Sequence, residues 1–406
     1  MPMDSFAFHG TAAVQVMPLV EPPPSGEQRR KSAAPWRDPV RLSQSQLDRF
    51  IRHHEAFLGR RPGGKRLMLR HAVLEGLTLA GHDLSEADLG GAQMSGCDLR
   101  QTKLAQADLY CADLTDVEAT GADFSRADMR GVSLRGARLN NTRLDGADLR
   151  AAVLAAINEA GGIARLGRER RTETEGGLIG EVGEAVENSA DLSDASLICA
   201  QMEGAFLKHA DFSGAVLAGA RLNGARLDGV RLKGAVLTGL NVGRLGLTSR
   251  QLEGGLFDPG PAALNRAPVL MHRLERAEAW WRSGGGEGEP AVFDGEDLRV
   301  VNGAFSGKSL TAMSAKRTLA VGLDFSGALL QGAQFDGADL RCANFEGADL
   351  RGASFAGCNL AHARFKGADI GELQVSETMR RAANFDEAHK PDLAEAVFGE
   401  AAKRAF

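Results

Sequence analysis

Residues 107–129 read ADLYCADLTDVEATGADFSRADM, and this stretch decides the architecture of the chain. A large apolar residue returns at nearly every fifth position, here at Leu109, Leu114, Phe124 and Met129. An alanine stands two positions before each of these four residues. A period of five fits neither the 3.6 residues of a helical turn nor the two residues of a flat strand. The stretch is therefore an internal repeat, and the repeat determines the fold.

Two inward positions and three outward positions in every five residues require a chain that turns a corner after each unit. Four units then close a square coil, and successive coils stack about 4.8 Å apart through backbone hydrogen bonds. The large side chain fills the centre of the coil, and the small one packs beside the wall. Glycine often precedes the large residue by three positions, as at Gly121, Gly136 and Gly337, which suits a tight corner.

The repeated phrase of alanine, then aspartate or asparagine, then leucine or phenylalanine resembles the pentapeptide-repeat family. Residues 107–109 (ADL), 122–124 (ADF) and 210–212 (ADF) are examples, and units in phase cover more than half of the chain. The resemblance implies an all-β solenoid, a right-handed quadrilateral β-helix. To this the sequence adds short capping α-helices.

Three blocks of the repeat can be counted. They hold 18 units centred on residues 69–154, 12 on 192–247 and 15 on 305–375, the last preceded by out-of-phase units at Phe293 and Leu298. The expected organisation is a disordered tail at 1–40, a capping helix at 41–64, block one at 65–154, an insertion at 155–189, block two at 190–257, a linker with a second capping helix at 258–290, block three at 291–388 and a C-terminal helix at 389–406.

The residues at the coil centres make up the predicted core. In block three, residues twenty apart share a wall, so that two facing walls of phenylalanine alternate with two walls of leucine. Such an interior leaves no room for a ligand. The core residues singled out from the three blocks are Leu89, Leu109, Phe124, Leu149, Phe212, Phe325, Phe335, Phe345, Phe355 and Phe365.

Both capping helices follow from local signals. Ser43 is a suitable N-cap, and Leu47 and Ile51 belong to an apolar stripe at helical spacing. When the later segment is aligned with this one, Leu270 and Leu274 fall on the same two positions, so we infer an internal duplication. A helix at an open end is expected, because a bare coil exposes apolar core and unpaired backbone groups.

Composition argues against several classes of function. The net charge of −5 over 406 residues favours no particular partner. The five cysteines show no paired spacing, so we expect neither disulfides nor a zinc site. We therefore expect a cytoplasmic location. No apolar run reaches the length of a membrane span, and residues 1–6 do not read as the start of a signal peptide. The nine histidines form no catalytic grouping, and we expect no enzymatic activity, cofactor or metal.

The densest basic cluster in the middle of the chain lies on the insertion, at Arg165, Arg168, Arg170 and Arg171. Guanidinium groups match the geometry of phosphate and carboxylate. The cluster is therefore the candidate contact for an anion or an acidic partner, and a solvated loop is the alternative interpretation.

The leading hypothesis for function is a non-enzymatic cytoplasmic scaffold or adaptor that presents flat faces to a protein partner. Under this hypothesis we expect no direct binding of nucleic acid. A terminal helix is the candidate contact in a homodimer. The resemblance offers a second hypothesis, a DNA mimic acting on a topoisomerase such as DNA gyrase. Mimicry needs dense negative charge, whereas residues 67–154 carry 13 acidic and 9 basic side chains, and residues 190–250 carry 5 and 7. The third hypothesis is a ligand-sensing adaptor that uses the arginine-rich insertion.

Overall fold

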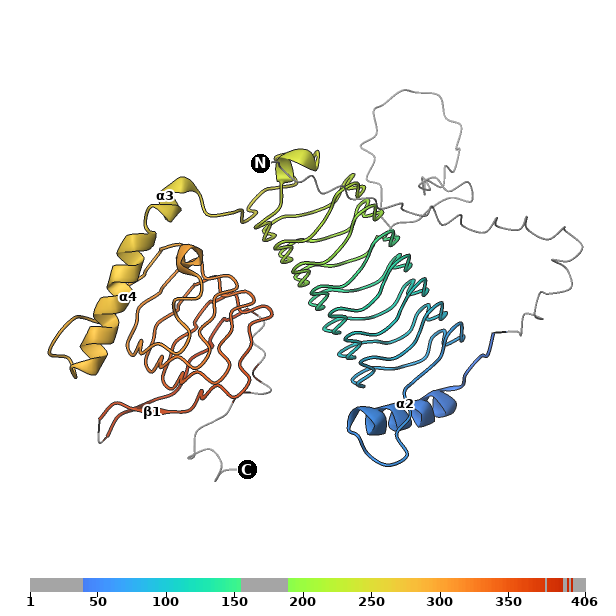
Figure 1. Cartoon of the computed structure of the whole chain (residues 1–406), viewed down its shortest axis with the longest axis horizontal. Helices are drawn as coiled ribbons and strands as arrows, with labels where there is room; N and C mark the ends of the chain where they lie inside the picture. The colour runs from blue at the N-terminus through green and yellow to red at the C-terminus, as the bar shows by residue number, and fades with distance from the viewer. Residues whose placement is uncertain (1–38, 155–188, 377, 390–392, 394–395, 397–406) are drawn as a thin grey trace, which may run out of the picture. The chain divides into compact units, whose positions relative to one another are not determined.

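The computed structural model of the chain describes residues 39–154, 189–376 and 378–389, together with residues 393 and 396 (Figure 1). The expected tail at 1–40, insertion at 155–189 and C-terminal helix at 389–406 lie outside the described residues apart from their edges. The repeats form two stacks of coils, each with its own apolar core. Stack one comprises residues 67–154 and 190–256, and stack two comprises residues 291–370 and 383–389.

Each coil is joined to the next by a regular pair of backbone hydrogen bonds. The Leu89 N–H donates to the carbonyl oxygen of Asp108 at 2.8 Å, and the Asp108 N–H donates to that of Ala87 at 2.9 Å. Asp88 thereby forms a parallel bridge with Asp108, and Asp108 forms one with Asp128. The bridged residues are twenty positions apart, which is the length of four repeat units.

Continuous sheet is scarce among the described residues. Two short strands, β1 (Leu373–Gln374) and β2 (Arg380–Arg381), pair antiparallel, and the coils contribute isolated bridges instead of longer strands. Each bridge column is therefore a ladder of single residues that runs along a stack. The right-handed, four-sided coil that the resemblance implies stays a prediction.

The backbone of the corner explains the position of the glycines. The residue two positions after the coil centre has a positive φ, as at Cys111 (53°) and Gly121 (70°). Glycine adopts this conformation freely, whereas another residue loses about 1 kcal/mol or more. The corner is then closed by the next N–H, as where Ala112 donates to the carbonyl oxygen of Leu109 at 2.9 Å.

Blocks one and two form a single stack, because the bridges continue across the segment between them. Arg138 pairs with Asp191, and Asp148 pairs with Gln201, as if the two blocks were adjacent in sequence. The Ala190 N–H donates to the carbonyl oxygen of Leu154 at 3.2 Å, which is the corner bond of an ordinary repeat. The two ends of the insertion therefore meet at one corner.

The interior of stack two is filled with phenylalanine rings. Phe325 and Phe365 each lie 5.1 Å from Phe345 between ring centroids, nearly parallel to it, and Phe335 meets Phe345 edge-on at 5.8 Å. Leu340, on a neighbouring wall, is fully buried. The ten core residues named from the sequence are all at most 2 % exposed: Leu89, Leu109, Phe124, Leu149, Phe212, Phe325, Phe335, Phe345, Phe355 and Phe365.

The helix α2 (Gln44–Leu58) covers the first coil of stack one. Ser43 caps it in a capping box with Gln46, and Leu47, Ile51 and His54 are buried. Both ring nitrogens of His54 have backbone partners: Nδ1 accepts from Leu67 N–H at 3.0 Å, and Nε2 lies 2.9 Å from the carbonyl oxygen of Ser85. Desolvation lowers the pKa of His54, so the neutral ring is favoured.

The helix α4 (Ala267–Arg282) packs on stack two through Leu270, Leu274 and Ala277. These three residues align with the three buried residues of α2 at one constant offset, as the proposed duplication requires. Short elements connect or end the stacks, namely α3 (Pro261–Leu264) and the 3-10 helices η1 (Val242–Arg244) and η2 (Leu298–Val301).

The prediction that the repeat of block three runs on in phase to residue 375 is wrong. Val375 is 55 % exposed and lies in the β1–β2 hairpin, where it is not a coil centre. The coil resumes at Phe385, whose ring stacks on Phe355 at 4.9 Å. The hairpin is an insertion in the last coil, and Leu373 packs above Gly352, where a larger residue would leave no space.

Candidate functional site

The interior of the stacks offers no site for chemistry. The coil centres are filled, and the buried thiols of Cys97 and Cys358 have pKa values raised by desolvation to about 11 and about 12. Within the described ranges, no three His, Cys, Asp or Glu side chains gather closely enough to hold a metal ion. Every helix in the described part of the chain is too short or too polar to cross a bilayer. Function must therefore be sought on the outer faces.

The outer faces carry a recurrent ion pair that the sequence analysis did not single out. In the phrase aspartate, leucine or methionine, arginine, the guanidinium binds the carboxylate two residues earlier through two hydrogen bonds. Arg130 donates to Asp128 at 2.8 and 2.6 Å, and this bonding lowers the pKa of the Asp128 carboxyl. The other pairs with this geometry are Asp98–Arg100, Asp148–Arg150, Asp297–Arg299, Asp339–Arg341 and Asp349–Arg351.

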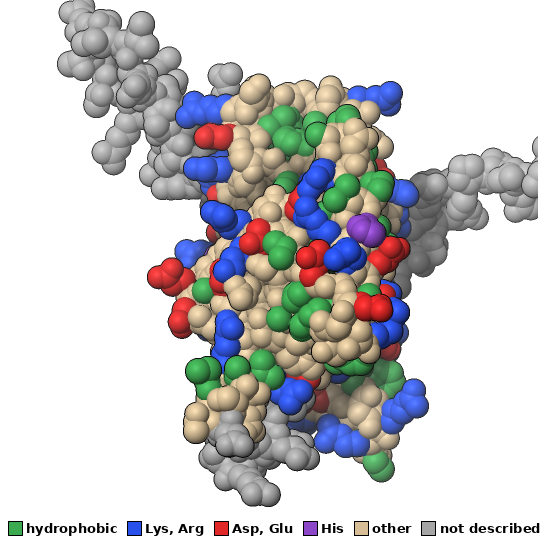
Figure 2. Space-filling model, turned by 90° about the vertical axis from the view of Figure 1, so that its left-hand side faces the viewer, with side chains coloured by type: hydrophobic (Ala, Val, Ile, Leu, Met, Phe, Trp, Pro, Cys, Tyr) green, Lys and Arg blue, Asp and Glu red, His purple; other side chains and the backbone are tan. Residues whose placement is uncertain are grey.

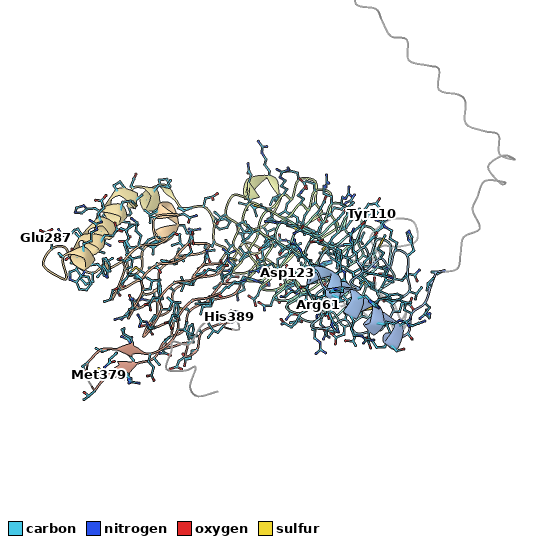
Figure 3. The ribbon with its side chains drawn as sticks, turned by 60° about the horizontal axis from the view of Figure 1, so that its bottom comes forward. Arg61, Tyr110, Asp123, Glu287, Met379 and His389 are labelled. Carbon is cyan, nitrogen blue, oxygen red and sulfur yellow. The ribbon has the colours of Figure 1, made fainter. Side chains whose placement is uncertain are left out.

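One face of stack one combines these pairs with the single tyrosine of the chain, Tyr110, which is labelled in Figure 3. We call it the Tyr110 face; its residues are Arg70, Asp88, Asp108, Tyr110, Asp128, Arg130, Asp148 and Arg150. Tyr110 is 48 % exposed, and the Arg130 guanidinium carbon lies 5.4 Å from its ring centroid. Tyr110 is thus supported by Arg130 and about half exposed to a partner.

The Tyr110 face does not present an uninterrupted row of negative charge. Its four aspartates lie on successive coils, but each has a guanidinium partner: Arg70 bonds both Asp88 and Asp108, and Arg130 and Arg150 bond the other two. Figure 2 shows acidic and basic side chains similarly interspersed on another face of the molecule. Neutralised carboxylates make a poor copy of the phosphate lattice of DNA.

A second set of contacts joins the two stacks, which fall within one compact unit that begins at Val40. Arg341 donates to the carbonyl oxygens of Gly214 and Gly234 at 3.0 and 2.9 Å. Arg299 donates to the carbonyl oxygen of Phe257 at 2.8 Å. Along the contact, residue numbers increase in one stack while they decrease in the other. The two stacks therefore pack antiparallel.

This contact explains two buried residues at outward positions of stack one. Val216 and Val236 occupy successive rungs of one ladder and are each only 1 % exposed. The Nε2 of His362 lies 2.6 Å from the carbonyl oxygen of Asp194, and burial raises the pKa of the nearby Cys342 thiol to about 12. The sequence signal for this interface was the pair of valines at positions where the other outward residues are mostly polar.

We expect Arg341→Leu to separate the stacks without unfolding either of them. The change removes two charge-assisted hydrogen bonds, each of which contributes about 1.5–3 kcal/mol. The measurement is the rate of alkylation of Cys342, which should rise towards the rates of the exposed Cys111 and Cys199.

Arg351→Leu is the matched control for that experiment. Arg351 makes the same two-pronged bond to Asp349, but it is 39 % exposed, whereas Arg341 is 7 % exposed. The control should leave the alkylation of Cys342 unchanged. Equal rates in the Arg341 variant and the wild type would contradict the role given to Arg341.

The basic residues selected from the sequence as an anion contact, Arg165, Arg168, Arg170 and Arg171, lie outside the described residues. None of these four arginines is therefore placed in a binding site by the described structure. The surfaces described above use other arginines, which the repeat places at fixed outward positions.

The family model described as pentapeptide repeats matches the chain in 8 copies, which include residues 69–104, 97–136, 133–155, 188–214, 207–239, 321–355 and 338–372. These matches fall on the two stacks and on both sides of the insertion. No curated protein matches the chain in sequence.

One similar solved structure is that of HetL from the cyanobacterium Nostoc sp. strain PCC 7120, a pentapeptide repeat protein involved in regulating heterocyst differentiation. HetL is 24 % identical to this chain, and the alignment covers 80 % of this chain and 96 % of HetL with a TM-score of 0.26. A trypsin-treated variant of QnrB1, a plasmid-mediated fluoroquinolone resistance protein, is 19 % identical over 52 % of this chain and 92 % of its own, with a TM-score of 0.25. Rfr23 from the cyanobacterium Cyanothece 51142 is 17 % identical over 52 % and 99 %, with a TM-score of 0.20. Scores this low carry no argument about shape or function.

The family assignment therefore rests on the repeat itself. The matched copies, the five-residue period and the bridges between residues twenty apart all describe the same unit. The resemblance noted in the sequence is confirmed, and the chain belongs to the pentapeptide-repeat family.

Proposed function

We propose that this protein is a non-enzymatic scaffold that binds a protein partner through the Tyr110 face. The exposure of Tyr110 is the observation that carries the proposal. Its ring is 48 % exposed and lies beside Arg130, and tyrosine and arginine are the residue types that most often dominate the energy of protein interfaces. In this proposal the coils are the right-handed quadrilateral β-helix of the family, which keeps the face flat and rigid.

Two further features support a binding role over catalysis. The centres of the coils are closed by leucine and phenylalanine, so converging catalytic groups would have to be built on the outside. The ion pairs of the Tyr110 face fix its arginines before a partner arrives, which lowers the entropy lost on binding. The five cysteines, all free thiols, are consistent with the cytoplasmic location that we propose.

The DNA-mimic hypothesis has less support from this face. Three guanidinium groups neutralise most of the charge of its four carboxylates. The ligand-sensing hypothesis depends on the insertion, whose arginines lie outside the described residues. We therefore retain the scaffold as the proposal.

A photo-crosslinking phenylalanine analogue at position 110 tests the proposal directly. We expect it to capture a discrete protein in cells, because the ring would be buried in the interface. Once that partner is isolated, Tyr110→Ala should weaken its binding by about 2 kcal/mol or more, about 30-fold.

The matched control places the same analogue at position 138, on the ladder of stack one that lies two repeat units away from the Tyr110 face along the coil. Arg138 is also exposed and is also ion-paired, with Glu118 at 3.1 Å. The same captured proteins at both positions, or none at position 110, would count against the Tyr110 face. Capture of a gyrase subunit at position 110 would support the DNA-mimic hypothesis instead.

A further inference from the structure

A groove lies along the contact between the stacks, beyond the surface used in the proposed function. Two adjoining cavities of about 350 and 510 Å³ share Arg143 and His362 in their linings. One wall is the ladder Lys103, Asp123, Arg143 of stack one (Asp123 is labelled in Figure 3), and the other includes His362 and Arg364 of stack two. Cavities of this size are typical of sites for small molecules.

Positive charge exceeds negative charge in the lining of the groove. The basic residues are Lys103, Arg126, Arg143 and Arg364, and the acidic residues are Asp123 and Asp145. The chain as a whole carries a net charge of −5. The groove is therefore a locally cationic region on an anionic protein. Binding of an anion there would not follow from the net charge of the protein.

The acidic side chains of the groove are already occupied by the protein. Asp145 accepts hydrogen bonds from the Ser196 hydroxyl and from Ile198 N–H at 3.1 Å, and Asp123 accepts one from Ser125 N–H at 2.9 Å. These hydrogen bonds come from neutral donors. Arg143 and Arg364 lie in longer ion pairs, with Asp145 at 3.7 Å and with Glu346 at 3.5 Å, so Lys103 and Arg126 are the cationic groups left for another partner.

Several donors of the groove lack a partner of their own. Among the described residues, no carboxylate lies within 4.0 Å of the Lys103 ammonium or the Arg126 guanidinium, and the closest approach of Arg143 to Asp145 is 3.7 Å. The hydroxyl oxygen of Ser125 is buried without a hydrogen-bond partner in the described structure. A buried polar group left unsatisfied costs about 1–3 kcal/mol, so a bound acceptor would relieve that cost.

We propose that this groove binds a small anion with two or more phosphate groups. Two adjoining cavities that both have cationic groups in their linings fit a chain of phosphates better than a single phosphate. Arginine and lysine bind phosphate oxygens through charge-assisted hydrogen bonds, and the Ser125 hydroxyl supplies a neutral donor. The groove has no Phe, Tyr or Trp in its described lining, so recognition rests on the phosphates and not on stacking with a base.

Calorimetry with inorganic tripolyphosphate and the full-length protein tests the proposal. We expect saturable binding near physiological salt, weakened about tenfold or more by the double change Lys103→Glu and Arg126→Glu. The affinity for ATP, measured in parallel, shows whether the ligand is a free polyphosphate or a nucleotide. Equal affinities for ATP and tripolyphosphate indicate recognition of the phosphates alone, and tighter binding of ATP indicates a nucleotide.

Two further variants keep the test independent of folding. Ser125→Ala should weaken binding while the melting temperature does not fall, because the change removes a hydroxyl that has no partner in the free protein. Arg138→Glu reverses an exposed charge outside the lining of the groove and should leave the affinity within about twofold. Absence of binding at millimolar tripolyphosphate, or an equal loss in the Arg138 variant, would overturn the proposal.

Discussion

Replacing Phe345 by aspartate is expected to unfold stack two. The ring of Phe345 packs against four other rings, two stacked at 5.1 Å and two edge-on at 5.8 and 5.5 Å, and it is fully buried. Removing a buried phenylalanine ring costs about 3–5 kcal/mol, and burying a carboxyl group without a partner adds to that loss. The sum approaches the whole stability of a typical domain, about 5–15 kcal/mol. The measurement is thermal unfolding followed by circular dichroism.

Two controls separate the effect of core position from that of substitution in general. Glu346→Lys alters the next residue, which faces outward and lies 3.5 Å from Arg364 in a pair that is about half exposed, so the loss should stay below about 1 kcal/mol. Phe345→Leu keeps an apolar side chain like those on the neighbouring walls and should leave the stack folded, at a smaller cost than the aspartate. Similar melting temperatures for the Phe345→Asp and Glu346→Lys variants would show that the register is wrong.

Deleting residues 155–187 should leave stack one folded although 33 residues are lost. In the shortened chain, Leu192 follows Leu154 by five positions, which is one repeat unit. The corner bond from Ala190 N–H to the carbonyl oxygen of Leu154 already exists at 3.2 Å, so the junction needs no new geometry. We expect a melting temperature within a few degrees of the wild type and weaker binding of a partner that the insertion helps to recognise.

A deletion only two residues longer is the decisive comparison. Removing 155–189 joins Leu154 directly to Ala190 and leaves too few residues to turn the corner. Block two would then have to slip by two positions, which turns its leucines away from the interior. We expect this variant to lose the cooperative unfolding of stack one. Unfolding of the 155–187 variant as well would instead make the insertion part of the structure.

The period of five was sufficient to predict the coils and their centres. Each unit repeats the same choice of one small and one large inward residue, and most bridges between coils join residues twenty positions apart. Leu89, Phe124 and Phe345 are therefore buried for a reason that can be read in their own repeat units. The sequence left the continuity of blocks one and two open, because the 38 residues from Leu154 to Leu192 are not a multiple of five. The bridge from Arg138 to Asp191 in the structure joins the two blocks.

The contact between the stacks was decided by tertiary structure alone. Arg341 and Arg351 occur in the same phrase, Asp-Leu-Arg, yet Arg341 reaches two carbonyl groups of stack one and Arg351 does not. The repeat determines that both side chains point outward. It does not determine which outward side chain contacts the other stack. The same holds for the groove, whose walls come from residues more than 200 positions apart, such as Lys103 and His362. A periodic sequence specifies neighbours along its own stack, and only the folding of one stack against the other creates a site between them.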